Sequence, residues 1–315
     1  MKKFFTSTTF LATLCCVLWA SPFVLLKVGL EIMPRPIEFA GYRFLLAGVI
    51  IALFAGVGVK EYLREVRENL STVIIVSIFH TSLLYSFFYM GQMRVDAAIG
   101  ALIVGGQPLF VALFAHFMKN DDKMNIRKAL SILLGLVGLV VVAMGKVDEI
   151  SVVGWTSIIG ILFLIGNNVS SGISNVIISR VHTHDIKPLV FSSSQLMVGG
   201  TTLLCVSYMW EGFYGLPVQW QWWASLSGLV FISAVAISLW FVLLSRPGVK
   251  VSELNMWKFL IPVIGSIEAW VFMKNESPTF TSLAGLLLLT SSLVMLNYPV
   301  IKRLFVNKNT KIPNR

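Results

Sequence analysis

Charged side chains are scarce in this sequence. Asp, Glu, Lys and Arg together make up 13% of its 315 residues, whereas hydrophobic residues make up 56%, and the mean hydropathy is +0.81. A soluble domain carries about 25% charged residues, and the interior of so small a soluble protein could not hold 22 Phe and 9 Trp. These proportions exclude a water-soluble protein and predict an integral membrane protein.

Cysteine is rare in the sequence, and the common motifs of hydrolases and nucleotide-binding proteins are missing from it. The 3 cysteines, Cys15, Cys16 and Cys205, lie in apolar runs, which predicts buried thiols rather than disulfides or a metal site. The chain contains no HExxH, no Gly-x-Ser-x-Gly and no glycine-rich phosphate loop. We therefore expect no catalytic residues, no metal and no cofactor.

Long apolar segments fill most of the chain. About 20 apolar residues are needed for a helix to cross the hydrocarbon layer, whereas a transmembrane β-barrel would show alternating segments of about ten residues. The first segment follows Lys2 and Lys3, as in a signal peptide, but it extends to Leu26 and is too long to be a cleaved one. The sequence predicts an all-α membrane protein of ten transmembrane helices, at residues 8–29, 38–59, 71–92, 97–118, 127–145, 153–179, 188–210, 222–244, 251–273 and 279–299.

The distribution of Lys and Arg predicts the orientation. The net charge is +10, but the basic residues are spread over short loops, so we expect no binding of nucleic acid. Lys and Arg accumulate on the cytoplasmic side of membrane proteins. With the N-terminus in the cytoplasm, 18 of them fall in inside segments and 4 in outside loops, namely Arg35, Arg94, Lys146 and Lys274. Both ends are therefore expected in the cytoplasm.

The two halves of the sequence resemble each other. Residues 101–140 and 255–295 each contain a proline within an apolar run, then Phe-Met-Lys-Asn, then a segment rich in Leu and Gly. The prolines are Pro108 and Pro262. The pattern predicts two five-helix repeats, at residues 1–149 and 150–299, followed by a basic cytoplasmic tail at 300–315. Since five is odd, the second repeat enters the membrane from the opposite side, which is common in transporters.

Several local patterns of the chain match those of a known superfamily. They are Leu18-Trp19-Ala20-Ser21-Pro22-Phe23 followed by Lys27, Arg43-Phe44-Leu45-Leu46-Ala47, and the acids just beyond the proline-containing helices, Asp121, Asp122 and Glu276. With ten helices in an inverted repeat, the chain resembles the drug/metabolite transporter superfamily and, within it, the EamA-type transporters. It departs from the pattern at Ala20, where many members have Gly, and at the first acid, which is an Asp pair rather than Glu. The resemblance implies a carrier in a bacterial inner membrane and leaves the substrate open.

Lys258 is the most conspicuous charge within a span. It lies about 12 Å inside the predicted helix at 1.5 Å per residue, where a charge costs about 2.5–3.5 kcal/mol on insertion scales. It also stands one turn before Pro262, whose ring leaves a backbone carbonyl free. One interpretation is that Lys258 binds an anionic or carbonyl group of a substrate. The alternatives are a lysine that reaches back to the cytoplasmic surface or one that pairs with Glu253.

Further polar and aromatic residues are candidates to line a pathway. Asn167 and Asn168 lie in a span that is rich in Ser and Asn, and Gln107 lies beside Pro108. Small polar residues also hold transmembrane helices together, so a packing role is the alternative for this group. Trp19, Tyr85 and Tyr89 are candidates for the walls. We expect these six residues, with Lys258, to form the substrate-binding set.

Two titratable residues and the two prolines are candidates for coupling or gating. Glu268 and His80 lie inside spans and could carry a coupled proton. The alternative for Glu268 is an ion pair with Arg43 or Lys27, and these two basic residues could instead extend towards the membrane surface. The alternative for His80 is a structural hydrogen bond. Pro108 and Pro262 would permit local bending.

These features favour a secondary transporter that moves a small polar or amphipathic metabolite, amino-acid-like or drug-like, by alternating access. We expect export, a small-molecule substrate, contact with membrane lipid, possible use of protons, and a monomer or weak homodimer. A membrane-embedded enzyme is the alternative from another class, and a channel-like facilitator is the third. The sequence offers neither a catalytic motif nor a ring of charges to support these two alternatives.

Overall fold

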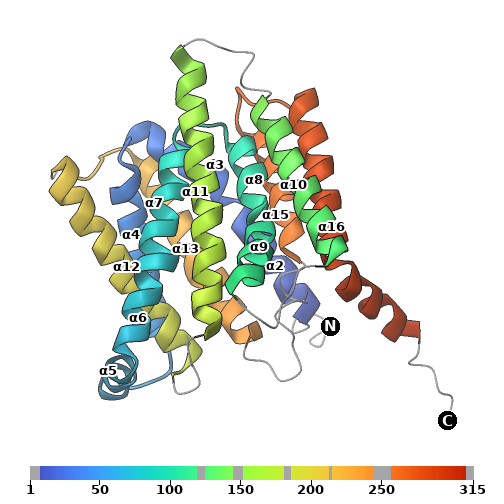
Figure 1. Ribbon diagram of the computed structural model, residues 1–315. Helices are drawn as coiled ribbons and strands as arrows, with labels where there is room; N and C mark the ends of the chain where they lie inside the picture. Colours follow the sequence, from blue (N-terminus) through green and yellow to red (C-terminus); the bar gives the residue numbers. More distant parts are fainter. Residues whose placement is uncertain are drawn as a thin grey trace.

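The computed structural model describes residues 8–118, 125–144, 152–180, 186–212, 215–244 and 257–309 (Figure 1). All regular structure in these ranges is helical. Within them, 8 helical segments are long and apolar enough to cross a membrane, and Leu260–Phe272 is a shorter apolar helix. The expectation of an all-α polytopic membrane protein is therefore confirmed. Of the other predicted spans, the one at 127–145 corresponds to a helix of 19 residues, Ile126–Met144.

The helices keep the labels of Figure 1. In chain order they are α2 (Thr8–Ala20), α3 (Pro22–Ile32), α4 (Pro36–Leu53), α5 (Val59–Glu68), α6 (Leu70–Val76), the π-helix η1 (Ser77–Leu83), α7 (Leu84–Gln92), α8 (Ala97–Gly105), α9 (Gln107–Met118), α10 (Ile126–Met144), α11 (Val152–Arg180), α12 (Pro188–Glu211), α13 (Trp220–Leu244), the 3-10 turn η2 (Trp257–Phe259), α15 (Leu260–Phe272) and α16 (Phe280–Asn309).

Several predicted spans are interrupted or contain a turn of π-helix. The first divides into α2 and α3 at Ser21, the third contains the π-helix η1, and the fourth divides into α8 and α9 at Gly106. Pro108 is the second residue of α9 and Pro262 the third residue of α15. Pro108 lies within the span Ala97–Phe114, directly after its break. Both prolines stand in the first turn of a helix, where the missing N–H costs little.

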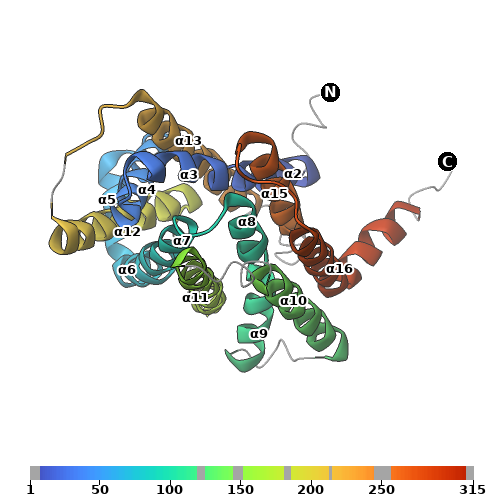
Figure 2. The ribbon, with the colours of Figure 1, turned by 90° about the horizontal axis from the view of Figure 1, so that it is seen from above.

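Small residues allow three pairs of helices to pack closely: α4 with α12, α8 with α15, and α10 with α16. A Cβ at Gly200 of α12 would overlap the backbone nitrogen of Leu45 in α4 and lie 2.9 Å from its Cα. A Cβ at Gly105 would lie 2.5 Å from the Cβ of Pro262. Seen from above, α4 and α12 lie on one side of the molecule and α10 and α16 on the other (Figure 2).

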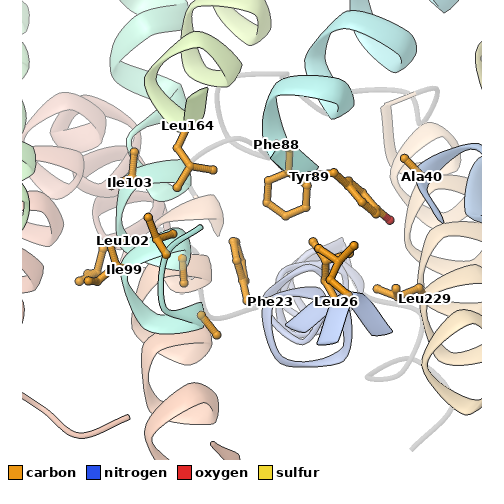
Figure 3. Close-up of a cluster of buried hydrophobic side chains, with 14 of the residues drawn as sticks. Phe23, Leu26, Ala40, Phe88, Tyr89, Ile99, Leu102, Ile103, Leu164 and Leu229 are labelled. Atoms are coloured by element: carbon orange, nitrogen blue, oxygen red, sulfur yellow. The ribbon is translucent and has the colours of Figure 1, made fainter. Parts of the chain in front are cut away.

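An apolar core fills the middle of the bundle. Phe23 and Leu26 of α3 meet Phe88 of α7, and Leu102 of α8 meets Leu164 of α11 (Figure 3). All five side chains are buried. The breaks in the first and fourth spans therefore lie against packed side chains of other helices. This position is required because unpaired backbone groups are not tolerated in contact with lipid.

Two carboxylates cap helices that lie far from them in the sequence. The Glu276 carboxylate accepts hydrogen bonds from the backbone N–H groups of Ala97, at 2.7 Å, and Ala98, at 2.9 Å, at the start of α8. Glu65 accepts one from the backbone N–H of Lys187, at 3.0 Å, at the start of α12. Burial raises the pKa of Glu276 above its ordinary value. Glu276 is the acid expected after the ninth span, whereas the corresponding Asp121 and Asp122 lie outside the described residues.

We predict that Gly200→Ala destabilises the protein by about 1–3 kcal/mol or more, because the added methyl group meets backbone atoms that cannot rotate away. Gly166→Ala in α11 is the matched control, since its Cβ would lie 3.4 Å from the nearest ring atom of Phe87, an ordinary contact. The control should be neutral or more stable by up to about 1 kcal/mol. Thermal unfolding in detergent measures both variants, and equal midpoints would contradict the close packing of α4 on α12.

Candidate functional site

The ammonium group of Lys258 lies between two indole rings. Its Nζ atom is 4.9 Å from the ring centroid of Trp240 in α13 and 5.5 Å from that of Trp19 in α2. The two ring centroids are 4.9 Å apart. Lys258 belongs to the 3-10 turn η2, directly before α15, and its side chain is partly exposed although it lies deep among the helices. The indole faces attract the cation without neutralising it.

No carboxylate among the described residues lies within ion-pairing distance of Lys258. The expected alternative partner, Glu253, lies outside the described residues. Lys258 also does not extend out of the bundle, because its Nζ atom remains on the two indoles. Ionisable residues inside a membrane are candidates for functional sites, and Lys258 has no carboxylate partner among the described residues.

His80 lies near this lysine, in the π-helix η1. Its Nδ1 atom is 3.2 Å from the Ser174 hydroxyl of α11, and the imidazole is close enough to Lys258 to interact electrostatically. π-helical turns occur frequently at functional sites, because they rotate side chains out of the regular helical register. The side chain of His80 is partly exposed. The structure thus brings Lys258, Trp19 and His80 together and adds Trp240, which the sequence did not single out.

A second cation lies at Arg43 in α4. Its side chain is only 4% exposed. Its Nε atom donates to the Ser233 hydroxyl at 2.7 Å, and Nη1 donates to the Tyr89 hydroxyl at 3.1 Å. The guanidinium carbon lies 5.0 Å from the ring centroid of Phe44 and 6.0 Å from that of Tyr85. The expectation that Arg43 reaches the membrane surface was wrong, because hydrogen bonds to two other helices hold it inside the bundle.

Glu268 pairs with neither of the basic residues proposed for it. It accepts a hydrogen bond from the Ser21 hydroxyl at 3.2 Å, at the break between α2 and α3. Arg43 is held by Tyr89 and Ser233, and Lys27 donates to the Val95 carbonyl at 2.7 Å. The alternative of an ion pair for Glu268 was therefore wrong within the described residues.

Asn167 and Asn168 are fully buried at the break in the fourth span. Asn168 donates from Nδ2 to the carbonyl of Ile103 at 2.7 Å, and Asn167 donates to the Asn168 Oδ1 atom at 3.1 Å. The Oδ1 atom of Asn167 is buried without a partner. Gln107 and Pro108 follow the same break and are partly exposed. Asn168 therefore supports the broken backbone, which favours the packing alternative for this residue.

The predicted residues thus form three groups rather than one. Lys258, Trp19 and His80 lie together, Tyr85 and Tyr89 surround Arg43, and the third group consists of Asn167, Asn168, Gln107 and Pro108 around Gly106. Arg43 and Trp240 were missed as site residues. The charge of Arg43 in hydrocarbon was a signal for its role, but a single Trp in an apolar run gives none.

Helices with breaks inside the bundle and cations deep in the membrane are features of secondary transporters. The EamA-like transporter family model matches residues 6–144 and again residues 158–298. The chain belongs to this family of membrane transporters.

The chain is similar to other proteins along nearly their whole length. The chain is 26% identical to the uncharacterized transporter YvbV of Bacillus subtilis, over 93% of this chain and 92% of that protein. It is 25% identical to a "Probable amino-acid metabolite efflux pump" of Salmonella typhimurium, over 90% of this chain and 92% of that protein. A solved crystal structure with 18% sequence identity superimposes with a TM-score of 0.64, covering 93% of this chain and 98% of its own. This last likeness concerns the fold alone.

We predict that Asn168→Ala costs about 1–3 kcal/mol of stability. It removes the acceptor of the Asn167 Nδ2 group, so that neither end of this buried amide has a partner. The double variant Asn167→Ala/Asn168→Ala should recover part of this loss, since it removes both polar partners together. Thermal unfolding of the two single variants and the double variant gives the coupling. Additive losses would show that the Asn167–Asn168 hydrogen bond contributes nothing to the fold.

Proposed function

We propose that the protein is a secondary transporter that exports a small polar or amphipathic metabolite, amino-acid-like or drug-like, by alternating access. The observation that carries the proposal is the Lys258 ammonium, held between Trp19 and Trp240 with no carboxylate partner among the described residues. Such a site attracts a compound with an acidic or carbonyl group and an apolar body, because the charge binds the first and the indoles bind the second. The name of the Salmonella relative is compatible with this class of substrate.

The inverted five-plus-five repeat remains part of this proposal. The family model matches twice, once in each half of the chain. Helices of the first half also pack on those that the repeat makes their counterparts: α4 on α12, α8 on α15, and α10 on α16. This reciprocity supports ten spans in two repeats at 1–149 and 150–299, with a basic tail at 300–315. Transporters of this design bind substrate where the two repeats meet.

Coupling to protons is proposed for Glu268 and His80. Glu268 borders the break in the first span, and His80 stands beside Lys258 in the π-helix. Both contact a hydroxyl rather than an oppositely charged group, so a change of protonation need not break an ion pair. The proposal includes Pro108 and Pro262 as positions of bending and a monomer or weak homodimer as the working state. Transport rather than catalysis is supported by the relatives, which are named as transporters.

We propose an inner-membrane location with both termini in the cytoplasm, from the excess of Lys and Arg on that side. We predict that a reporter active only outside the cytoplasm is active when fused near Lys146 or Pro217 and silent near Asp122 or Asp185. Immunoblots of the fusions control for expression. Activity at Asp122 would contradict the orientation and the inverted repeat with it.

We predict that Lys258→Met lowers transport by at least about tenfold, because a lost charge-assisted contact is worth about 1.5–3 kcal/mol. Expression should be equal or higher, since the buried charge is removed. A comparison of metabolites between an overexpressing and a deletion strain identifies the substrate, and counterflow in proteoliposomes then measures its transport. Lys302→Met, at an exposed position of α16, is the matched control and should transport normally.

Normal counterflow by a well-expressed Lys258→Met protein would exclude contact between this lysine and the substrate. Poor folding of the variant, with recovery in Lys258→Met/Glu253→Gln, would make the lysine structural instead. Absence of counterflow in the wild-type protein, with any metabolite that the strain comparison identifies, would exclude a carrier.

A further inference from the structure

We propose that Arg43 is a second binding site for the acidic group of the substrate, selective for a carboxylate and separate from Lys258. The proposal rests on the proposed transport function and specifies its substrate as a carboxylate with an apolar body. It begins from the charge of Arg43. A guanidinium does not lose its proton in a protein, so this residue carries a full positive charge at 4% exposure. Among the described residues, no carboxylate lies within ion-pairing distance of it.

The partners that Arg43 does have are neutral. The Ser233 and Tyr89 hydroxyls accept hydrogen bonds from Nε and Nη1, and the rings of Phe44 and Tyr85 lie beside the guanidinium. These contacts lower the cost of burial but leave the net charge unchanged. Glu268, the carboxylate expected to balance the charge, bonds to Ser21 instead. Among the described residues no group balances this charge, and a bound anion would do so.

The remaining hydrogen-bonding capacity also fits an anion. A guanidinium has five N–H donors, and Nη2 has no partner among the described residues. The hydroxyls of Tyr89 and Ser233 each accept from the guanidinium, so each retains its own O–H to donate. The three side chains thus offer donors and no strong unoccupied acceptor. The planar fork of a guanidinium matches the two oxygens of a carboxylate.

The position of Arg43 connects it with the Lys258 site. Ser233, which holds Arg43, and Trp240, which holds Lys258, both belong to α13 and are seven residues apart. Residues i and i+7 share one face of a helix and are separated by about 10 Å. The two cations are therefore bound by the same face of α13 at two levels. Both cations are flanked by aromatic rings. Each therefore offers a charge to the acidic group of a ligand and an apolar surface to the rest of that ligand.

The test measures binding without transport. Phenylacetate and phenylacetamide are nearly equal in shape and differ in charge, and inorganic phosphate at equal ionic strength represents the other common anion. Thermal unfolding of the purified full-length protein in nanodiscs, titrated with each compound, gives the affinities. The variants are Arg43→Gln, Arg43→Lys, Tyr89→Phe and Lys258→Met. Arg64→Gln, at an exposed position of α5, is the matched control.

We predict that phenylacetate stabilises the wild-type protein and Arg64→Gln, whereas phenylacetamide stabilises neither. Arg43→Gln should bind phenylacetate at least about tenfold more weakly, since it loses a charge-assisted contact. Arg43→Lys should be intermediate, because it keeps the charge and loses the planar fork. If Arg43→Gln does not fold, Tyr89→Phe decides, since it keeps the charge and removes one donor; its affinity should fall about threefold or more.

Three outcomes would overturn the proposal. The first is that folded Arg43→Gln binds phenylacetate with wild-type affinity, or that Tyr89→Phe does so where only that variant folds. The second is that phenylacetate does not stabilise the wild-type protein, and the third is that only phosphate stabilises it. These results are separable from a failure of the transporter proposal. Counterflow that is lost in Lys258→Met, with unchanged phenylacetate binding in Arg43→Gln, would leave transport standing without this site. Binding that depends on Arg43, in a protein that shows no counterflow, would leave the site without transport.

Discussion

The need to satisfy every backbone polar group away from water governs this structure. In hydrocarbon an unpaired carbonyl or amide costs several kcal/mol, so a helix can be interrupted only where other protein groups replace the lost hydrogen bonds. At the break after α8, Asn168 bonds to the carbonyl of Ile103. At the start of α8, the Glu276 carboxylate accepts hydrogen bonds from two backbone N–H groups. These helix ends thus depend on side chains from other parts of the chain: Asn168 of α11 and Glu276 of the loop after α15.

Within the part of the chain that the structure describes, aromatic rings rather than carboxylates lie beside both cations. A carboxylate beside Lys258 or Arg43 would neutralise the charge and would compete with any acidic ligand. Indole, phenol and phenyl rings attract a cation through their π-electrons and carry no net charge. Trp19, Trp240, Phe44 and Tyr85 therefore make burial less costly while the positive potential is retained. This arrangement is compatible with the proposed binding and release of an acidic group.

The sequence predicted the membrane helices well and their contacts poorly. Hydropathy reports whether a segment is apolar along its length, so the segments around Trp19 and Arg43 were found, whereas the segment after Lys258 is a shorter apolar helix, Leu260–Phe272. It does not report which faces meet, and thus the indole of Trp240 beside Lys258 and the Ser233 hydroxyl on Arg43 could not be found. The prolines illustrate an intermediate case. Pro108 and Pro262 did mark irregular backbone, but only the structure shows that each one stands in the first turn of a helix rather than within one.

The crossing of α10 and α16 has a mechanical consequence. A Cβ at Gly138 of α10 would lie 3.1 Å from the backbone nitrogen of Leu289, and one at Gly285 of α16 would lie 3.1 Å from the carbonyl oxygen of Gly138. The Ser292 hydroxyl also bonds to the Ser131 carbonyl at 2.6 Å. Backbone atoms have no rotamers, so the parts of this contact that consist of backbone cannot adapt by side-chain adjustments. We therefore expect α10 and α16 to move together as one rigid unit at the side of the protein.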